Sequence, residues 1–289
     1  MSIELNHVYN ENCLSTLSRM DNNFVDLIVT SPPYDSLRSY KGYSFDFESV
    51  ARELFRVLKP GGVVVWVVGD QTVDGSESGT SFRQALFFKE IGFNLHDTML
   101  YAKDGPPLND NRYQQEFEYM FVFSKGKPKT FTPILIESTY GNTKRMSNYH
   151  RANEGGFKVG KPTPRIRPNG MKLKGNIWHF ICGGIKGTSD VVSFKHPATF
   201  PEQLTHDHIV SWSLPGDLVF DPFSGSGTTL KMAKFLNRNY LGSEISAEYC
   251  AIIEERLKEK VLEEFPFFSV EDGKWNLPKG DLKEEESFF

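Results

Sequence analysis

The sequence predicts an α/β fold whose core is a doubly wound, mostly parallel sheet. Short runs that are apolar throughout, such as residues 63–68, are typical of strands buried on both faces of a parallel sheet. Segments with apolar side chains at helical spacing alternate with these runs along the chain. A basic stretch with many glycines and prolines, near residues 128–193, interrupts the alternation. We therefore expect one α/β domain with a segment inserted into it.

The first half of the chain supplies most of the expected strands. Leu14, Leu17 and Met20 lie at helical spacing after a short strand, and apolar residues share one face of the next helix until Lys59-Pro60-Gly61-Gly62 ends it. The expected elements are a strand and helix over 7–20, a strand over 25–30, a helix over 47–62, a strand over 63–70, a helix over 81–93, and a strand pair over 95–103 and 117–126.

The second half returns to the alternation after the basic stretch. Helices are expected over 201–213, 228–236 and 247–261, and strands over 217–220 and 239–245. The resulting division of the chain is a first half of the domain over 1–127, an inserted basic region over 128–193, a second half over 194–261, and an acidic extension over 262–289.

Positive charge is concentrated in one part of the chain. The formal net charge is −4, yet residues 125–195 hold fourteen Lys and Arg against three acidic residues, and the remainder holds nineteen against thirty-four. Such segregation is typical of a surface that meets a polyanion on one side. A solvated basic loop without a partner is the alternative. Interleaved aromatic residues favour an irregular recognition region over regular elements.

Several classes of protein are disfavoured by what the sequence lacks. It contains no apolar run of bilayer-spanning length and no N-terminal signal pattern. Cys13, Cys182 and Cys250 form no paired motif, so we expect a reducing, cytoplasmic location and no disulfide framework. His206 and His208 have no companion ligands at metal spacing, and we expect them on a polar helix face.

A rigid loop follows the apolar run that ends at Thr30. Residues 31–34 read Ser-Pro-Pro-Tyr. Neither a strand nor a helix continues through two prolines, because proline lacks the N–H donor and fixes φ. In an open α/β sheet, ligands bind at the carboxyl ends of the strands, where this loop is expected. The simpler interpretation is that the two prolines only end a strand.

A second loop with ligand-binding character follows Asp221. Gly225 and Gly227 let a ligand approach the backbone, and the helix expected from Thr228 favours an anionic group at its start. The lysine of a phosphate-binding loop and the glycine spacing of a dinucleotide fingerprint are both missing. A small carboxylate fits instead, with Asp221 facing an ammonium and Glu244, after the next strand, accepting ribose hydroxyls. These three groups together describe S-adenosylmethionine.

Together, the two loops resemble the motifs of the DNA amino-methyltransferases. Residues 30–34 read Thr-Ser-Pro-Pro-Tyr and residues 221–229 read Asp-Pro-Phe-Ser-Gly-Ser-Gly-Thr-Thr. This family methylates the exocyclic nitrogen of cytosine (N4) or adenine (N6). The catalytic motif precedes the cofactor motif, which is similar to the circularly permuted β group of restriction-modification enzymes. HPATFP at 196–201 and the YLGSE ending at Glu244 are similar to further motifs, and the resemblance spans about 5–258.

The resemblance implies a seven-stranded methyltransferase sheet in which the strand ending at Asp221 lies beside the strand ending at Thr30. Residues 1–127 would then form the catalytic half and 194–261 the half that binds S-adenosylmethionine. Asn12 stands where many family members have an aspartate. The implied catalytic residues are Ser31, Pro32, Pro33 and Tyr34, and the implied cofactor contacts are Asp221, Phe223, Ser224, Gly225, Ser226, Gly227, Thr228, Thr229, Glu244, Asn12, Cys13, His196, Pro197 and Phe200.

By analogy with the family, the target base leaves the DNA duplex and stacks on Tyr34. Ser31 and the Pro32 carbonyl then accept hydrogen bonds from its amine, which attacks the methyl group directly. Ser-Pro-Pro-Tyr is mostly associated with N4-cytosine enzymes, and N6-adenine is the alternative.

The inserted target-recognition region is expected to contact phosphates or guanines of the DNA. The candidate residues are Lys144, Arg145, Arg151, Arg165, Arg167, Lys172 and Lys174.

Other functions and partners stay open on sequence alone. An RNA or free-nucleotide methyltransferase would share the catalytic loop, and a non-catalytic DNA-binding module would keep only the fold. A nucleotide hydrolase is disfavoured by the missing lysine. Besides double-stranded DNA, a second copy of the chain and a companion restriction endonuclease are candidate partners. The implied location is the cytoplasm, in association with the nucleoid.

Overall fold

An eight-stranded sheet forms the core of the protein, as seen in a computed structural model. The structure describes residues 3–33, 45–103, 112–137, 146–151, 157–164, 171–180, 201–258, 269–271 and 274–276. In spatial order the strands are β1 (His7–Tyr9), β14 (Asn239–Ser243), β13 (Leu218–Asp221), β2 (Val25–Thr30), β3 (Leu58–Val68), β7 (Phe117–Ser124), β6 (Asn94–Lys103) and β12 (Ile177–Phe180). Neighbouring strands are parallel except where β7 pairs with β3 and β6. The predicted fold class is confirmed.

Helices cover both faces of the sheet and create two separate cores. On one face lie α1 (Cys13–Leu17), α2 (Phe47–Val57) and α3 (Thr80–Glu90), and on the other lie α4 (Glu202–Trp212), α5 (Thr228–Phe235) and α6 (Ala247–Lys258). Alternate residues of β3 point to opposite cores: Trp66 belongs to the first, whereas Val65 and Val67 belong to the second. Both faces of this strand are therefore apolar, which explains its uninterrupted hydrophobic run.

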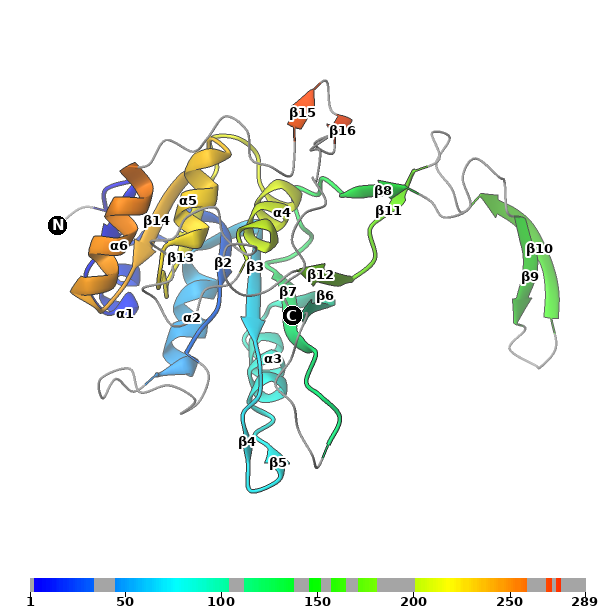
Figure 1. Cartoon of the computed structure of the whole chain (residues 1–289), viewed down its shortest axis with the longest axis horizontal. Coiled ribbons are helices and arrows are strands. Elements are labelled where there is room, and N and C mark those ends of the chain that lie inside the picture. Colours follow the sequence, from blue (N-terminus) through cyan, green and yellow to red (C-terminus); the bar gives the residue numbers. More distant parts are fainter. Residues whose placement is uncertain are drawn as a thin grey trace, which may run out of the picture.

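The centre of the sheet is a topological switch point between β13 and β2. Val219 pairs with Leu27 and Phe220 with Ile28, as the predicted neighbourhood of the two strands requires. The chain leaves β2 through α2 towards β3, and it leaves β13 through α5 towards β14 on the other side. Ligand-binding crevices form where such crossovers diverge, outside the carboxyl ends of the strands. Figure 1 shows β13 below α5 with β2 beside it, between β14 on one side and β3 on the other.

The inserted region differs from the prediction in two respects. It contains two antiparallel ladders, β8 (Leu135–Glu137) with β11 (Met171–Leu173) and β9 (Met146–Arg151) with β10 (Phe157–Pro164), where an irregular segment was expected. The last strand described in this region, β12, pairs with β6 and adds an eighth strand to a sheet expected to have seven. Strand formation here depends on the partner across the ladder, which local composition does not reveal. Figure 1 shows the β9–β10 ladder far from the sheet, at the end opposite α6.

Two expectations about particular helices also need correction. The helix expected over 47–62 ends at Val57, and residues 58–62 already belong to β3. The expected polar face of α4 is wrong, because His206 and His208 are both buried and His208 stacks on Trp178 at 4.7 Å between ring centroids. This helix is enclosed on most of its circumference, so its polar residues are interior ones.

The remaining described elements are short. β4 (Thr72–Val73) and β5 (Ser76–Glu77) form a hairpin after β3, and β15 (Ser269–Glu271) pairs with β16 (Lys274–Asn276) in the acidic extension.

Over the ranges given above, no helix combines the length and the hydropathy needed to cross a membrane. Within the same ranges, no cluster of three or more His, Cys, Asp or Glu side chains has the arrangement of a metal site.

Candidate active site

Hydrogen bonds between buried groups join the carboxyl end of β2 to the carboxyl end of β13 and to the start of α5. The Thr30 hydroxyl donates to Asp221 Oδ1 at 2.6 Å, although the two residues are 191 positions apart in sequence. The Thr229 hydroxyl, in the first turn of α5, donates to the Val29 carbonyl at 3.1 Å. All four residues are buried, where hydrogen bonds are electrostatically stronger than in water. The loops that follow β2 and β13 therefore start from one fixed junction.

The Ser-Pro-Pro loop lies directly beyond this junction. Ser31 and Pro33 are partly exposed and Pro32 is buried, while Tyr34 lies outside the described residues. The chain is described again from Phe45, whose ring lies edge-on to Phe223 with 5.2 Å between centroids. Phe223 belongs to the loop after β13. The chain is therefore next to that second loop where its description resumes at Phe45.

The loop over residues 223–227, called the glycine loop below, has a backbone shape that requires glycine. Gly225 and Gly227 have φ values of 53° and 81°, in the left-handed region that other residues rarely adopt. A Cβ atom at Gly227 would also lie 2.9 Å from the Ile253 side chain. The Ser224 amide donates to the Ser243 carbonyl at 3.0 Å, which ties the loop to β14. A substitution at Gly227 would meet both strain and a steric clash.

Asp221 has a structural role in addition to the one predicted. Its Oδ1 accepts from the Phe223 amide at 3.0 Å as well as from Thr30, so it shapes the glycine loop and links that loop to β2. Burial raises the pKa of the Asp221 carboxyl to about 6, against the opposing effect of its hydrogen-bond donors. A cationic partner beside Asp221 would favour the charged carboxylate and lower this pKa again.

Glu244 lies at the carboxyl end of β14, next to the glycine loop. Its Oε2 accepts from the Gly225 amide and its Oε1 from the Ser246 amide, both at 2.9 Å. Burial raises the pKa of this carboxyl, and the amide donors oppose that rise. The Ile245 amide is a third donor that opposes the rise. A carboxylate has about four acceptor positions, so Glu244 retains capacity for a hydroxyl donor.

The segment that follows β1 contacts the end of β14 at Glu244 and then continues into α1. Asn10 donates to the Glu244 carbonyl at 2.9 Å, which joins β1 to β14 at their carboxyl ends. The Asn12 side chain caps α1 by accepting from the Leu14 amide at 2.9 Å. Cys13 is a buried thiol in the first turn of that helix. His196, Pro197 and Phe200 lie outside the described residues.

A family model described as DNA methylase matches residues 25–255. The chain belongs to the DNA methylase family. This methylase is 55% identical over 241 residues to the orphan methyltransferase M.BamHII of Bacillus amyloliquefaciens, across 82% of the chain and 90% of the relative. It is therefore a DNA methyltransferase of the N6/N4 class.

Two solved structures share the fold of the methylase. The PvuII cytosine-N4-specific DNA methyltransferase matches with a TM-score of 0.65 at 21% identity, over 90% of this chain and 89% of that one. A DNA modification methylase of Thermus thermophilus, solved in complex with S-adenosyl-L-methionine, matches with a TM-score of 0.58 at 25% identity, over 87% and 92% of the two chains. Both comparisons agree with the predicted methyltransferase fold.

The candidate DNA contacts of the methylase are spread over the inserted region. Arg151 is the last residue of β9, and Lys172 lies in β11. The Lys174 ammonium is directed inwards, 3.1 Å from Asp207 and 4.3 Å from the centre of the Trp178 ring, so it suits a DNA contact least. The candidates outside the described residues are Lys144, Arg145, Arg165 and Arg167.

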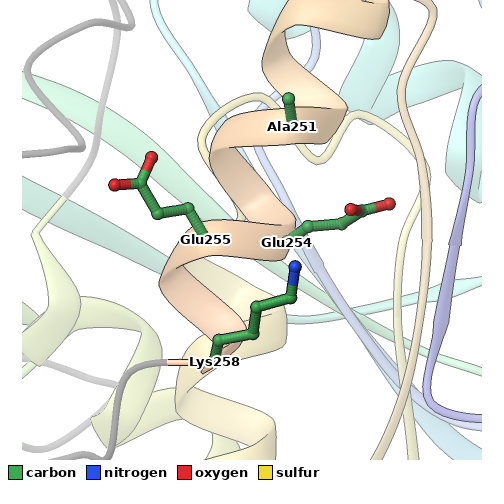
Figure 2. Close-up of a pocket in the computed structure, with 4 residues that line it drawn as sticks. All are labelled: Ala251, Glu254, Glu255 and Lys258. Atoms are coloured by element: carbon green, nitrogen blue, oxygen red, sulfur yellow. The ribbon is translucent and has the colours of Figure 1, made fainter.

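A surface hollow of about 580 Å³ lies on α6 of the methylase (Figure 2). Its lining residues are Ala251, Glu254, Glu255 and Lys258, all exposed on the outer side of the helix. The opposite side of α6 faces the glycine loop. None of the predicted site residues lines this hollow, and its two carboxylates give it no complementarity to the phosphates of DNA.

Three functional candidates were missed by sequence reasoning. Arg256, Glu202 and Lys231 are buried together behind the glycine loop. The only sequence signal was that Arg256 follows Ile252 and Ile253 at helical spacing, so it shares their buried side of α6. A charged residue on an apolar helix side indicates a buried partner.

Proposed function

We propose that the methylase transfers a methyl group from S-adenosylmethionine to the exocyclic N4 of a cytosine extruded from double-stranded DNA. One observation carries the proposal: the hydrogen bond between Thr30 and Asp221. It matters because the Ser-Pro-Pro loop and the glycine loop, which this bond joins, open at the same edge of the sheet.

The residues around the glycine loop fit S-adenosylmethionine. The first turn of α5 offers N–H groups without helical partners, which suit a carboxylate. Asp221 would face the ammonium, Glu244 would accept the ribose hydroxyls, and Phe223 offers an aromatic surface to the adenine. When bound, the cofactor supplies an electrophilic methyl group on a sulfonium. The Thermus methylase, which has this cofactor in its solved complex, supports the assignment.

The Ser-Pro-Pro loop would orient the amine of the target base. The lone pair of an exocyclic amine is delocalised into the ring, which makes it a poor nucleophile. The Ser31 hydroxyl and the Pro32 carbonyl are acceptors that would bind the two amine hydrogens and draw the nitrogen towards tetrahedral geometry. Two prolines keep these acceptors in place, and orientation of this kind can lower a barrier by roughly 7 kcal/mol in favourable cases.

The base that is methylated can be read directly from the product. We would incubate the methylase with duplex DNA and S-adenosylmethionine carrying a trideuterated methyl group, and then analyse the digested nucleosides by mass spectrometry. Labelled N4-methylcytosine is the expected product. Labelled N6-methyladenine, which the other branch of the family would give, would refute the cytosine assignment. Label in RNA but not in duplex DNA would refute the substrate class.

Cofactor binding should weaken as the pH falls through about 6. The pKa of Asp221 in the free protein is raised to about 6 by burial. A bound ammonium stabilises the carboxylate, so binding must displace a proton at any pH below this value. From pH 7 to pH 5 we expect the dissociation constant for S-adenosylmethionine to rise about tenfold. Calorimetric titration across this range would measure it, and a flat profile would show that Asp221 does not face the ammonium.

The inserted region would contact the DNA. The β9–β10 ladder is a two-stranded ribbon, an element that the major groove of B-DNA admits. The proposed contacts from this region are Lys144, Arg145, Arg151, Arg165, Arg167 and Lys172.

Replacement of Arg151 should reduce the salt dependence of DNA binding. If Arg151 neutralises one phosphate, Arg151→Gln lowers the slope of log affinity against log salt by about 0.9. Lys59→Gln is the control, because Lys59 pairs with Asp26 at the amino edge of the sheet, 2.7 Å between Nζ and Oδ2. Fluorescence anisotropy in a salt series measures both variants. If Arg151→Gln and the unaltered protein had the same slope of log affinity against log salt, Arg151 would not contact a phosphate of the DNA.

A further inference from the structure

Three charged side chains are buried together behind the glycine loop. Arg256 of α6, Glu202 of α4 and Lys231 of α5 are 1%, 2% and 3% exposed. Glu202 Oε1 lies 3.0 Å from Arg256 Nη2 and 2.8 Å from Lys231 Nζ. Charged residues are almost never fully buried unless they are paired. Such a cluster calls for a reason beyond the packing of the domain.

The guanidinium group of Arg256 connects this cluster to the glycine loop. Its Nη1 donates to the Ser226 carbonyl at 2.6 Å, to the Ser226 hydroxyl at 3.1 Å and to the Thr228 hydroxyl at 3.3 Å. Ile253, one turn earlier in α6, packs against Gly227. The same side of α6 thus determines the shape of the glycine loop through one hydrogen-bonding residue and one apolar residue.

Stability alone gives a poor account of this arrangement. Removing ions from water is costly, and apolar side chains of similar volume often stabilise a protein as well as a buried ion pair does. What arginine offers is geometry: its guanidinium is always charged and presents its donors in a rigid planar fork. Glycine residues leave the loop free to adopt other conformations. External contacts are therefore needed to keep the loop in one shape.

We propose that Arg256 is a positioning residue for the methyl donor, and that Glu202 orients Arg256. Arg256 holds the Ser226 carbonyl and the hydroxyls of Ser226 and Thr228 towards the interior, so the front of the loop keeps the shape that binds the donor. Glu202 begins α4 immediately after the segment 196–201. Through Arg256 it joins the start of α4 to the glycine loop. The inference rests on the proposed role of this loop in binding S-adenosylmethionine.

The test compares two conservative arginine substitutions. Arg256→Lys keeps the charge but cannot reach Glu202 and three loop acceptors at once. Arg238→Lys is the matched control: Arg238 donates to the Ser213 carbonyl at 2.7 Å, the Ser213 hydroxyl at 3.1 Å and the Leu236 carbonyl at 2.7 Å, away from the glycine loop. For each variant we would measure the melting temperature, the dissociation constant for S-adenosylmethionine, and kcat and KM for duplex DNA.

Arg256→Lys is expected to raise the dissociation constant for S-adenosylmethionine at least about tenfold, because displacement of a binding loop by a fraction of an ångström has effects of this size. KM for DNA should stay within about twofold, since only donor binding is affected. Arg238→Lys should lower the melting temperature comparably and leave donor affinity unchanged. Unchanged donor affinity in Arg256→Lys, or equal losses in both variants, would overturn the inference.

Glu202→Gln gives a second test that does not require the Arg256 variant to fold. Gln keeps an oxygen acceptor for Arg256 and removes the charge, so a weaker donor affinity in the same direction is expected. Donor affinity equal to that of the unaltered protein would overturn the role of Glu202. If the unaltered protein itself failed to bind S-adenosylmethionine, the proposed function would be wrong, which is a different result from either variant behaving normally.

Discussion

Asp221→Asn should weaken the binding of S-adenosylmethionine by about a hundredfold. The amide oxygen can still accept from Thr30 and from the Phe223 amide, so the change removes mainly the negative charge that would face the ammonium. Loss of one member of a buried charge pair costs about 3 kcal/mol, which corresponds to about a hundredfold in affinity. Calorimetric titration with the cofactor measures the effect.

Unfolding should not explain this loss. Burial raises the pKa of Asp221 to about 6, so at neutral pH its charge opposes folding, and Asn should leave the melting temperature unchanged or higher. Asp217→Asn is the matched control at the other end of β13, where Asp217 accepts from the Leu214 amide at 2.8 Å. If Asp221→Asn bound the cofactor as well as Asp217→Asn does, Asp221 would not be part of the cofactor site.

Tyr34→Ala should reduce kcat by up to about a hundredfold, because base–aromatic stacking contributes about 1–3 kcal/mol per base. The position follows directly after Pro33, at the carboxyl end of β2, and the side chain is proposed to stack on the extruded base. Cofactor affinity should not change, since the glycine loop is intact. Single-turnover methylation of duplex DNA and a cofactor titration would separate the two effects.

Tyr34→Phe supplies the control for this prediction. It keeps the ring and removes only the hydroxyl, so most of the activity lost in Tyr34→Ala should return. A loss of cofactor affinity equal to the loss of turnover would contradict the division of roles between the two loops. Failure of the phenylalanine variant to recover activity would argue against stacking as the function of this residue.

Much of the sheet could be predicted because its strands carry a local signal. Residues 63–68 are apolar throughout, and the structure shows why, since alternate side chains of β3 enter two different cores. The loops after Thr30 and Asp221 were recognisable from proline and glycine, which restrict or free the backbone in ways that few other residues do. Their meeting at one junction was implied by the family resemblance and is confirmed by the pairing of β13 with β2.

The features that escaped prediction depend on distant partners. Arg256 lies in a charged segment that is typical of a solvated helix, and only the fold brings it to Glu202 and Ser226. His208 on α4 was expected on a polar helix face, yet it is buried and stacks on Trp178 of the inserted region. β12 joins the sheet through its pairing with β6. Burial of these residues is decided by contacts between segments, which a local pattern does not contain.

The central claim is that the two loops form one site, with the methyl donor on one side and the target base on the other. A crystal structure of the methylase with duplex DNA and a non-transferable analogue of S-adenosylmethionine tests it most directly. We expect the analogue on the glycine loop and an extruded cytosine at Ser31, with its amine about 3–3.5 Å from the group that replaces the methyl. An analogue bound elsewhere, or a target base held away from residues 31–34, would contradict the account.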